Sequence, residues 1–125
     1  MKQILSNDII NQYLPTLINC PLFSKLGEPE LRGYLHNAKV IVHSYKKNDF
    51  IALSGDPMEG IGVILEGSAL LTRENVMGQR VIMANLEQSD IFGEALLFSK
   101  QPLWPATIKA TKATKIMFIP LETFI

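Results

Sequence analysis

The chain has 125 residues, a length that suits one domain, and its 12 basic and 12 acidic residues cancel to a formal net charge of zero. These charges are scattered, and Lys46-Lys47 is the only adjacent basic pair, so no patch would follow a nucleic-acid backbone. Cys20 is the only cysteine, which excludes a disulfide framework, a zinc knuckle or an iron–sulfur cluster within one chain. Because no stretch has the pattern of a signal peptide or a membrane span, we expect a cytoplasmic protein.

The first third of the chain has the spacing of helices. Apolar residues recur every three or four positions from Ile9 to Leu14 and again from Leu31 to Ala38. Pro15 is expected to end the first of these helices and to open a second short turn, because proline interrupts helical hydrogen bonding. Pro29 stands between two glutamates, where the first residue of a helix belongs. We therefore place short helices within residues 8–38.

From residue 39 onwards the apolar pattern changes from helical spacing to alternation, which predicts strands. The predicted strands are Val40 to Tyr45, Phe50 to Leu53, Ile61 to Leu65, Ser68 to Thr72, Arg80 to Leu86, Ala106 to Ala110 and Thr114 to Ile119, and Ile91 and Phe92 are expected to end a further strand. Asn48 lies in a predicted turn and is suited to a positive φ. Short strands separated by turn residues, without βαβ alternation, indicate a mostly β jelly-roll or sandwich barrel with short N-terminal helices.

The stretch from Asp90 to Ala110 combines a strand end, a glycine, a short helix, a loop and a returning strand. Gly93 permits a tight turn or a close approach of the backbone, because it has no Cβ. The predicted helix from Glu94 to Phe98 would begin with amide groups that lack intrahelical partners. Together with the helix dipole, these amides favour an anion. Glu94 is therefore a ligand-contact candidate, with a purely capping role as the alternative.

The run Gly93-Glu94-Ala95-Leu96-Leu97-Phe98, followed by Pro105 to Ala110, resembles the phosphate-binding cassette of the cyclic-nucleotide-binding fold. The relatives it suggests are the effector domains of bacterial Crp/Fnr-type transcription regulators, and the resemblance covers roughly Pro21 to Ile125. In nucleotide-binding members a Gly-Glu pair opens the helix, and Arg-Ser or Arg-Thr precedes the returning strand. The glutamate binds the ribose 2′-hydroxyl, and the arginine and backbone amides hold the phosphate. The ligand-binding residues that this resemblance implies are Phe92, Gly93, Glu94, Ala95, Leu96, Trp104, Pro105 and Ala106.

The family pattern is broken at its cation. Counted without a gap, the arginine position falls on Trp104 and the serine position on Pro105, so one weak donor and no backbone N–H replace a guanidinium. Losing a charge-assisted contact costs about 1.5–3 kcal/mol. Lys109 alternates with Ile108 and is expected to point out of the barrel. We therefore expect the fold without a response to cyclic AMP. Trp104 would either stack on an aromatic effector or pack at the rim or under a partner helix.

The segment from Pro120 to Ile125 has the pattern of a first helical turn. In the resembling family a long dimerisation helix begins here and a helix-turn-helix domain follows. We accordingly expect residues 1–125 to form one effector-sensing domain, with a barrel at 39–120 and a truncated dimerisation helix from 121. The resemblance implies an unknown small-molecule effector and a homodimer in the full-length protein. It also implies contact with DNA only through a C-terminal domain outside this chain, and no membrane.

Two other classes remain open. The first is a cupin-like metal-dependent enzyme, although His36 and His43 are seven residues apart and no third ligand stands at useful spacing. The second is a ligand-free interaction module whose pocket is filled by Trp104 and Phe92. Haem ligation by His43, Cys20 or a methionine is not selected by any spacing. We expect a regulatory domain rather than an enzyme, with no cofactor and no metal.

Overall fold

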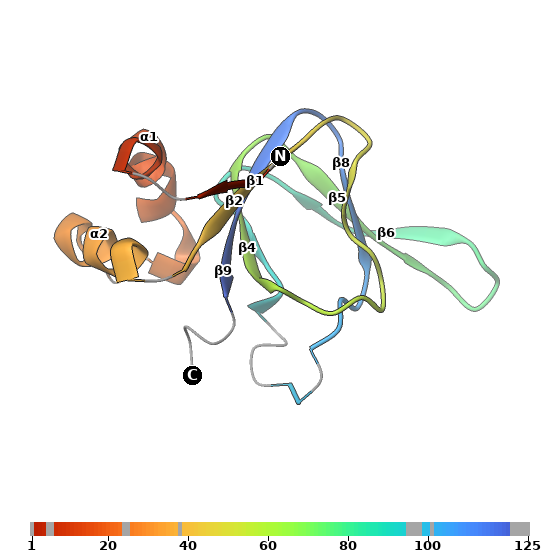
Figure 1. Ribbon diagram of the computed structural model, residues 1–125. Helices are drawn as coiled ribbons and strands as arrows, with labels where there is room; N and C mark the ends of the chain where they lie inside the picture. Colours follow the sequence, from red (N-terminus) through yellow and green to blue (C-terminus); the bar gives the residue numbers. More distant parts are fainter. Residues whose placement is uncertain are drawn as a thin grey trace.

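The computed structural model describes residues 2–4, 7–23, 26–37, 39–94, 99–100 and 102–120. Two antiparallel sheets face each other, and the helices lie beside the first sheet (Figure 1). The first sheet has the strand order β1 (Lys2–Ile4), β2 (Ile41–Tyr45), β9 (Thr114–Pro120), β4 (Gly60–Glu66) and β7 (Ile91–Phe92). The second has the order β3 (Phe50–Ala52), β8 (Thr107–Ala110), β5 (Ala69–Glu74) and β6 (Arg80–Leu86). The helical elements are α1 (Asn7–Ile18), the 3₁₀ turn η1 (Pro21–Phe23) and α2 (Glu28–Asn37).

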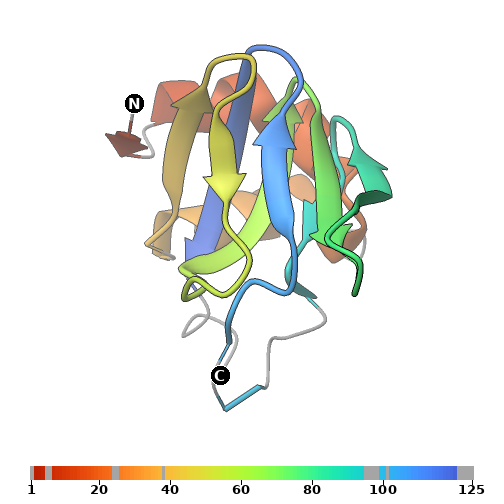
Figure 2. The ribbon, with the colours of Figure 1, turned by 90° about the vertical axis from the view of Figure 1, so that its right-hand side faces the viewer.

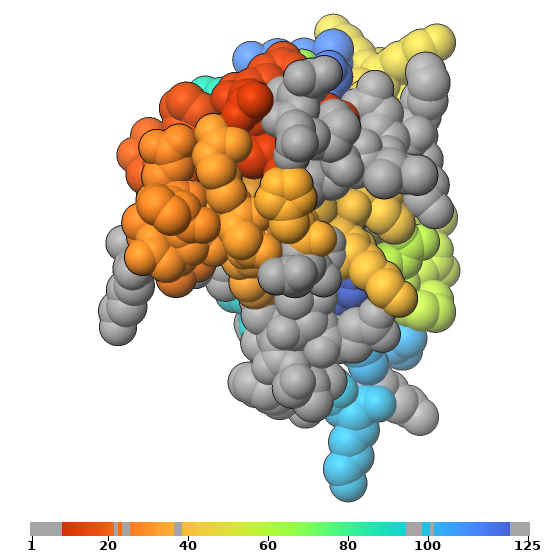
Figure 3. All heavy atoms as spheres, turned by 60° about the vertical axis from the view of Figure 1, so that its left-hand side comes forward, coloured from red at the N-terminus to blue at the C-terminus, as the bar shows by residue number. Residues whose placement is uncertain are grey.

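This arrangement confirms the predicted mostly β jelly-roll with short N-terminal helices. Figure 2 looks onto the second sheet, with the helices behind the first. In space-filling form α1 and α2 lie against each other on one side of the molecule (Figure 3). No helix among the described residues is long and apolar enough to cross a membrane.

The first sheet separates two apolar cores, because successive side chains of a strand point to opposite faces. Met117 and Ile119 of β9 pack against the helices, with Leu17 and Leu35 among their neighbours in that core. The side chain of Ile116, on the opposite face of β9, packs between the two sheets. Both faces of β4 and β9 are thus buried, which explains why their sequences are apolar without a clear alternation.

Two N-terminal details differ from the sequence expectations. Pro15 lies inside α1 rather than ending it, and β1 was not predicted. A proline inside a helix costs about 3 kcal/mol. The helix nevertheless continues, because Leu14 and Leu17, on either side of the proline, both enter the helix-side core with Ile10. Burying one leucine side chain contributes about 1.5–3 kcal/mol, so the two together offset the cost of the proline.

The β5–β6 hairpin projects away from the body of the domain (Figure 1). Its turn and its edge strand carry exposed apolar side chains. These are Val76, Met77, Val81, Ile82 and Met83. They account for part of the high apolar content of the sequence without contributing to either core.

Candidate functional site

The predicted cassette begins as the sequence indicates. β7 ends at Phe92, and Gly93 follows with a φ of +93°, a conformation that favours glycine. Glu94 is exposed to solvent. Ala95 and Leu96, the next two predicted ligand contacts, lie outside the described residues. The glycine turn is therefore confirmed, whereas a ligand contact by Glu94 stays a prediction.

Trp104 is buried, with 6% of its surface exposed. Its indole packs against the ring of Phe92, and the two centroids are 5.7 Å apart. A Cβ placed on Gly93 would lie 3.2 Å from Cζ3 of Trp104 and 2.9 Å from Cε of Met58. The indole therefore occupies the space directly beside the glycine turn, within the core between the two sheets.

Backbone hydrogen bonds fix the position of Trp104. Its N–H donates to the carbonyl of Asp56 at 2.8 Å, and its own carbonyl accepts from the N–H of Gly55 at 2.8 Å. The N–H of Met58 donates to the carbonyl of Pro102 at 2.9 Å, one step further along the same pairing. The returning segment of the cassette is thus joined to the loop that connects β3 and β4.

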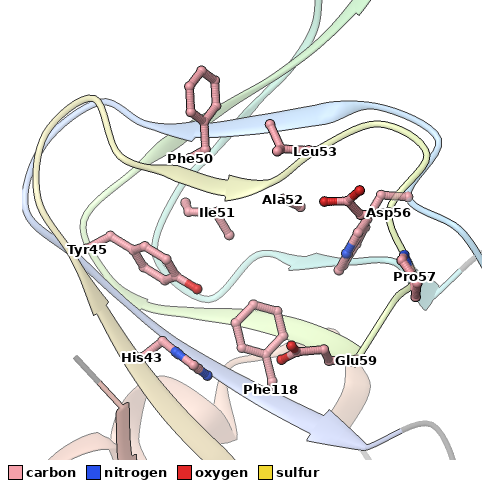
Figure 4. Close-up of a pocket in the computed structure, with 11 residues that line it drawn as sticks. His43, Tyr45, Phe50, Ile51, Ala52, Leu53, Asp56, Pro57, Glu59 and Phe118 are labelled. Atoms are coloured by element: carbon pink, nitrogen blue, oxygen red, sulfur yellow. The ribbon is translucent and has the colours of Figure 1, made fainter.

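A cavity of about 280 Å³ lies on the open side of the barrel between β2 and β3, and we call it the β2–β3 cavity (Figure 4). Aromatic rings supply much of its lining, and they come from β2, β3, β9 and the returning segment of the cassette. These rings belong to His43, Tyr45, Phe50, Trp104 and Phe118. Of the six predicted ligand-binding residues that the structure describes, only Trp104 is among the residues that line it.

The rings are packed against one another. The imidazole of His43 stacks on Tyr45, with centroids 6.1 Å apart, and meets Phe118 edge-on at 5.6 Å. Phe118 in turn meets Phe92 edge-on at 6.0 Å. Phe118 therefore connects the β2–β3 cavity with the aromatic contact that closes the cassette.

The charged groups of this cavity are acidic. Asp56 and Glu59 contribute carboxylates, and no lysine or arginine whose side chain the structure describes lines the cavity. Burial of Tyr45, followed by the negative charges of Glu59 and Asp49, raises the pKa of its hydroxyl to about 12. The hydroxyl is thus uncharged at neutral pH, and the carboxylates of Asp56 and Glu59 would repel an anionic ligand.

The fold places the other predicted site residues in different environments. Ala106 is buried at 2% exposure, whereas Pro105 is exposed and lines a different hollow of about 370 Å³ with Arg73 and Arg80. Lys109 points away from the barrel core, as its alternation predicts, and its ammonium lies 5.6 Å from the centroid of the exposed Phe50 ring. The structure thus brings Phe92, Gly93 and Trp104 together and leaves Pro105 on another surface.

Sequence reasoning missed most of the β2–β3 cavity. Tyr45 and Phe118 come from strands far apart in the chain, and Asp56 and Glu59 come from a loop without a motif. Alternation could have indicated that Phe118 and Ile116 share a face, but β9 is buried on both faces. No sequence signal in this chain pairs β2 with β9.

The two histidines are separated by the fold. His36 is exposed on α2, and His43 lies on β2. Among the described residues, no group of three or more histidine, cysteine, aspartate or glutamate side chains is close enough to hold a metal ion. The metal-site hypothesis therefore receives no support from this part of the chain.

Comparisons with known proteins identify the family. The cyclic nucleotide-binding domain model matches residues 42–125, and the chain belongs to this family. It is 29% identical over 97 residues to the cAMP-activated global transcriptional regulator CRP of Pasteurella multocida, an alignment that covers 78% of this chain and 46% of that protein. The chain thus spans about half the length of this relative. The resemblance to Crp/Fnr-type effector domains, inferred above from the cassette, is confirmed.

Solved structures share the fold. A putative cyclic nucleotide binding protein from Ruegeria pomeroyi superimposes with a TM-score of 0.80 at 22% identity, over 92% of this chain and 50% of that one. The sensor domain of the transcriptional regulator DNR from Pseudomonas aeruginosa gives a TM-score of 0.77 at 20% identity, over 92% of this chain and 77% of that one. At these identities the likeness concerns the fold alone.

Proposed function

We propose that this chain is the effector-sensing domain of a Crp/Fnr-like transcription regulator and that its effector is not a cyclic nucleotide. The observation that carries the proposal is the placement of Trp104. The family resemblance puts an arginine at this position, and here a buried indole packs against Phe92 and the turn at Gly93. A cyclic phosphate would have to displace this side chain from the core.

Electrostatics favour the same conclusion. Lys109 and Arg80 line hollows on the outer face of the second sheet and are not among the residues that line the β2–β3 cavity. The carboxylates of Asp56 and Glu59 border the side of Trp104 that faces this cavity. A phosphate would therefore lose a charge-assisted contact worth about 1.5–3 kcal/mol, which corresponds to about one to two decades in affinity.

The effector would enter the β2–β3 cavity, and β9 would transmit its presence. Phe118 lines the cavity two residues before Pro120, where β9 ends. A ligand that moves the Phe118 ring would act on the strand that leads directly into residues 121–125, which lie outside the described residues. Such a ligand regulates only as far as it prefers one arrangement of this strand over another.

DNA binding and dimerisation would depend on a part of the regulator that corresponds to the CRP sequence outside the aligned region. The CRP relative is a transcription regulator, and the alignment covers 46% of it. In this scheme residues 1–125 act as the sensing domain, with a dimerisation helix from residue 121. The chain would regulate and would not catalyse a reaction.

Calorimetric titration of the purified chain with cyclic AMP and cyclic GMP tests the proposal. We expect no binding heat for either nucleotide. The CRP of Pasteurella multocida, described as cAMP-activated, serves as the positive control in the same buffer. Submicromolar binding of either nucleotide to this chain would overturn the assignment of a non-nucleotide effector.

A ligand-free interaction module is the second candidate. Phe92 and Trp104 fill the cassette from within, as this alternative requires. The β2–β3 cavity favours the sensor, because a module without a ligand needs no such hollow beside its aromatic core. The binding of any small molecule that perturbs Trp104 would decide between the two.

A further inference from the structure

We propose that the β2–β3 cavity binds a small organic cation, an ammonium group attached to an apolar body. This inference rests on the proposed effector-sensing role and specifies the chemical class of the effector. Aromatic rings and two carboxylates form much of the lining, and among the described side chains no lysine or arginine contributes to it. A cation with an apolar body is the ligand whose charge and surface both match such a cavity.

The rings are placed to receive a cation. Figure 4 shows Tyr45 and Phe118 directed toward the space between β2, β3 and β9, with Ile51 on the opposite wall. The face of an aromatic ring attracts a cation within about 6 Å of its centroid, and more strongly where water is excluded. Phe118 is buried, with 7% of its surface exposed, whereas Asp56 and Glu59 are exposed to solvent, so the cation would be shielded from water on the ring side alone.

The carboxylates border the cavity on two sides. In Figure 4 the side chain of Asp56 extends in beside Ala52, and that of Glu59 lies beside Phe118. Asp56 is held in place because its carbonyl accepts from the N–H of Trp104 and its own N–H donates to Leu53 at 3.0 Å. Within the described part of the chain, neither carboxylate forms a salt bridge. Their charge is therefore available to a ligand.

The order of groups across the cavity specifies the orientation of the ligand. An ammonium group would lie between the two carboxylates and the ring of Phe118. The apolar body would extend past Ile51 toward Tyr45 and Phe50. A volume of about 280 Å³ is near the small end of ligand sites, so the body would be no larger than one ring with a short chain.

Fluorescence of Trp104 provides a direct test, because it is the only tryptophan of the chain and lines the cavity. The probes are phenethylammonium, phenethyl alcohol and phenylacetate, which share a ring and differ in charge. We expect phenethylammonium to change the emission saturably, with an affinity at least about tenfold above that of the alcohol. Phenylacetate should bind most weakly.

Charge-removing variants locate the cation. Glu59→Gln and Asp56→Asn should each weaken phenethylammonium binding by about tenfold and leave the alcohol unchanged. Glu30→Gln, at an exposed position on α2 outside the cavity, is the matched control and should have no effect. Thermal unfolding of each variant verifies that the chain remains folded.

Two results would overturn the inference. If the alcohol or phenylacetate binds as tightly as the ammonium, the cavity is not selective for cations, although an effector-binding role still holds. If none of the three probes changes the emission of Trp104, the cation site is wrong. The calorimetric titration with cyclic nucleotides decides the proposed function separately in either case.

Discussion

The indole of Trp104 and the ring of Phe92 pack with their centroids 5.7 Å apart and their planes inclined at 39°. Both side chains are buried, at 6% and 4% exposure. This contact closes the space beside Gly93 that the family resemblance assigns to a phosphate. It makes one residue, Trp104, both a core side chain and a wall of the β2–β3 cavity.

Replacing Trp104 by alanine should lower the free energy of unfolding by about 3–5 kcal/mol, because a large buried side chain leaves a cavity behind. Trp104→Phe should cost clearly less, since it retains a ring beside Phe92. Denaturant unfolding followed by circular dichroism measures both values. A loss below about 1 kcal/mol for Trp104→Ala would show that the indole is not part of the core.

Alanine substitutions at two glycines with positive φ distinguish the cost of backbone strain from the cost of steric overlap. Gly93→Ala and Gly78→Ala should each cost about 1–2 kcal/mol for the left-handed conformation. At Gly93 the new methyl group also meets Met58 and Trp104, whereas at Gly78 nothing lies within 4 Å. Gly93→Ala should therefore destabilise the domain more than Gly78→Ala does, by about 1–3 kcal/mol. Equal losses in thermal unfolding would refute the packing of Trp104 against Gly93.

Gly62 leaves room for Phe92. A Cβ at position 62 would overlap the Phe92 ring, so Gly62→Ala should destabilise the domain by about 1–3 kcal/mol. In the Gly62→Ala, Phe92→Leu double variant the loss should be smaller than the sum of the two single losses by about 1 kcal/mol. Strict additivity in a double-mutant cycle would contradict this contact.

The alkaline limit of stability should depend on Tyr45. Burial, followed by the charges of Glu59 and Asp49, raises the pKa of its hydroxyl to about 12, above its ordinary value of 10.0. A raised folded-state pKa means that the stability contribution is complete below about pH 10 and is lost as the pH rises toward 12. Tyr45→Phe should therefore lose less stability than the native chain between these values.

Denaturant unfolding at about pH 9 and about pH 11.5 measures this difference. Tyr13 and Tyr34, whose pKa values burial also raises, contribute equally to both chains and serve as the internal reference. The same loss of stability in the native chain and in Tyr45→Phe would show that Tyr45 does not have the raised pKa.

The sequence predicted much of the fold because local chemistry determines it. Arg80–Leu86 matches its predicted bounds, a strand ends at Phe92 as predicted, and Asn48 has the positive φ expected of its turn, at 74°. The prediction that Pro15 ends a helix was wrong, because it considered only the local loss of helical hydrogen bonding. Burial of Leu14 and Leu17 in one core is a tertiary effect that overrides it.

The candidate site could be predicted only in part. Gly93 was recognisable because a positive φ needs glycine, and the departure at Trp104 was visible by counting from it. The β2–β3 cavity could not be predicted, because Tyr45, Glu59 and Phe118 come together only when β2 pairs with β9, more than half of the chain away. Pairing of this kind depends on long-range packing rather than on any local pattern.

The most direct measurement of the central claim is the response of two amide resonances to cyclic AMP. In a nitrogen–proton correlation spectrum, the backbone signal of Gly93 and the indole signal of Trp104 report on the turn and on the ring that fills it. We predict that neither signal moves when cyclic AMP is added in large excess. A saturable shift of both, with the Gly93 amide moving as it does on hydrogen bonding to an anion, would contradict the account.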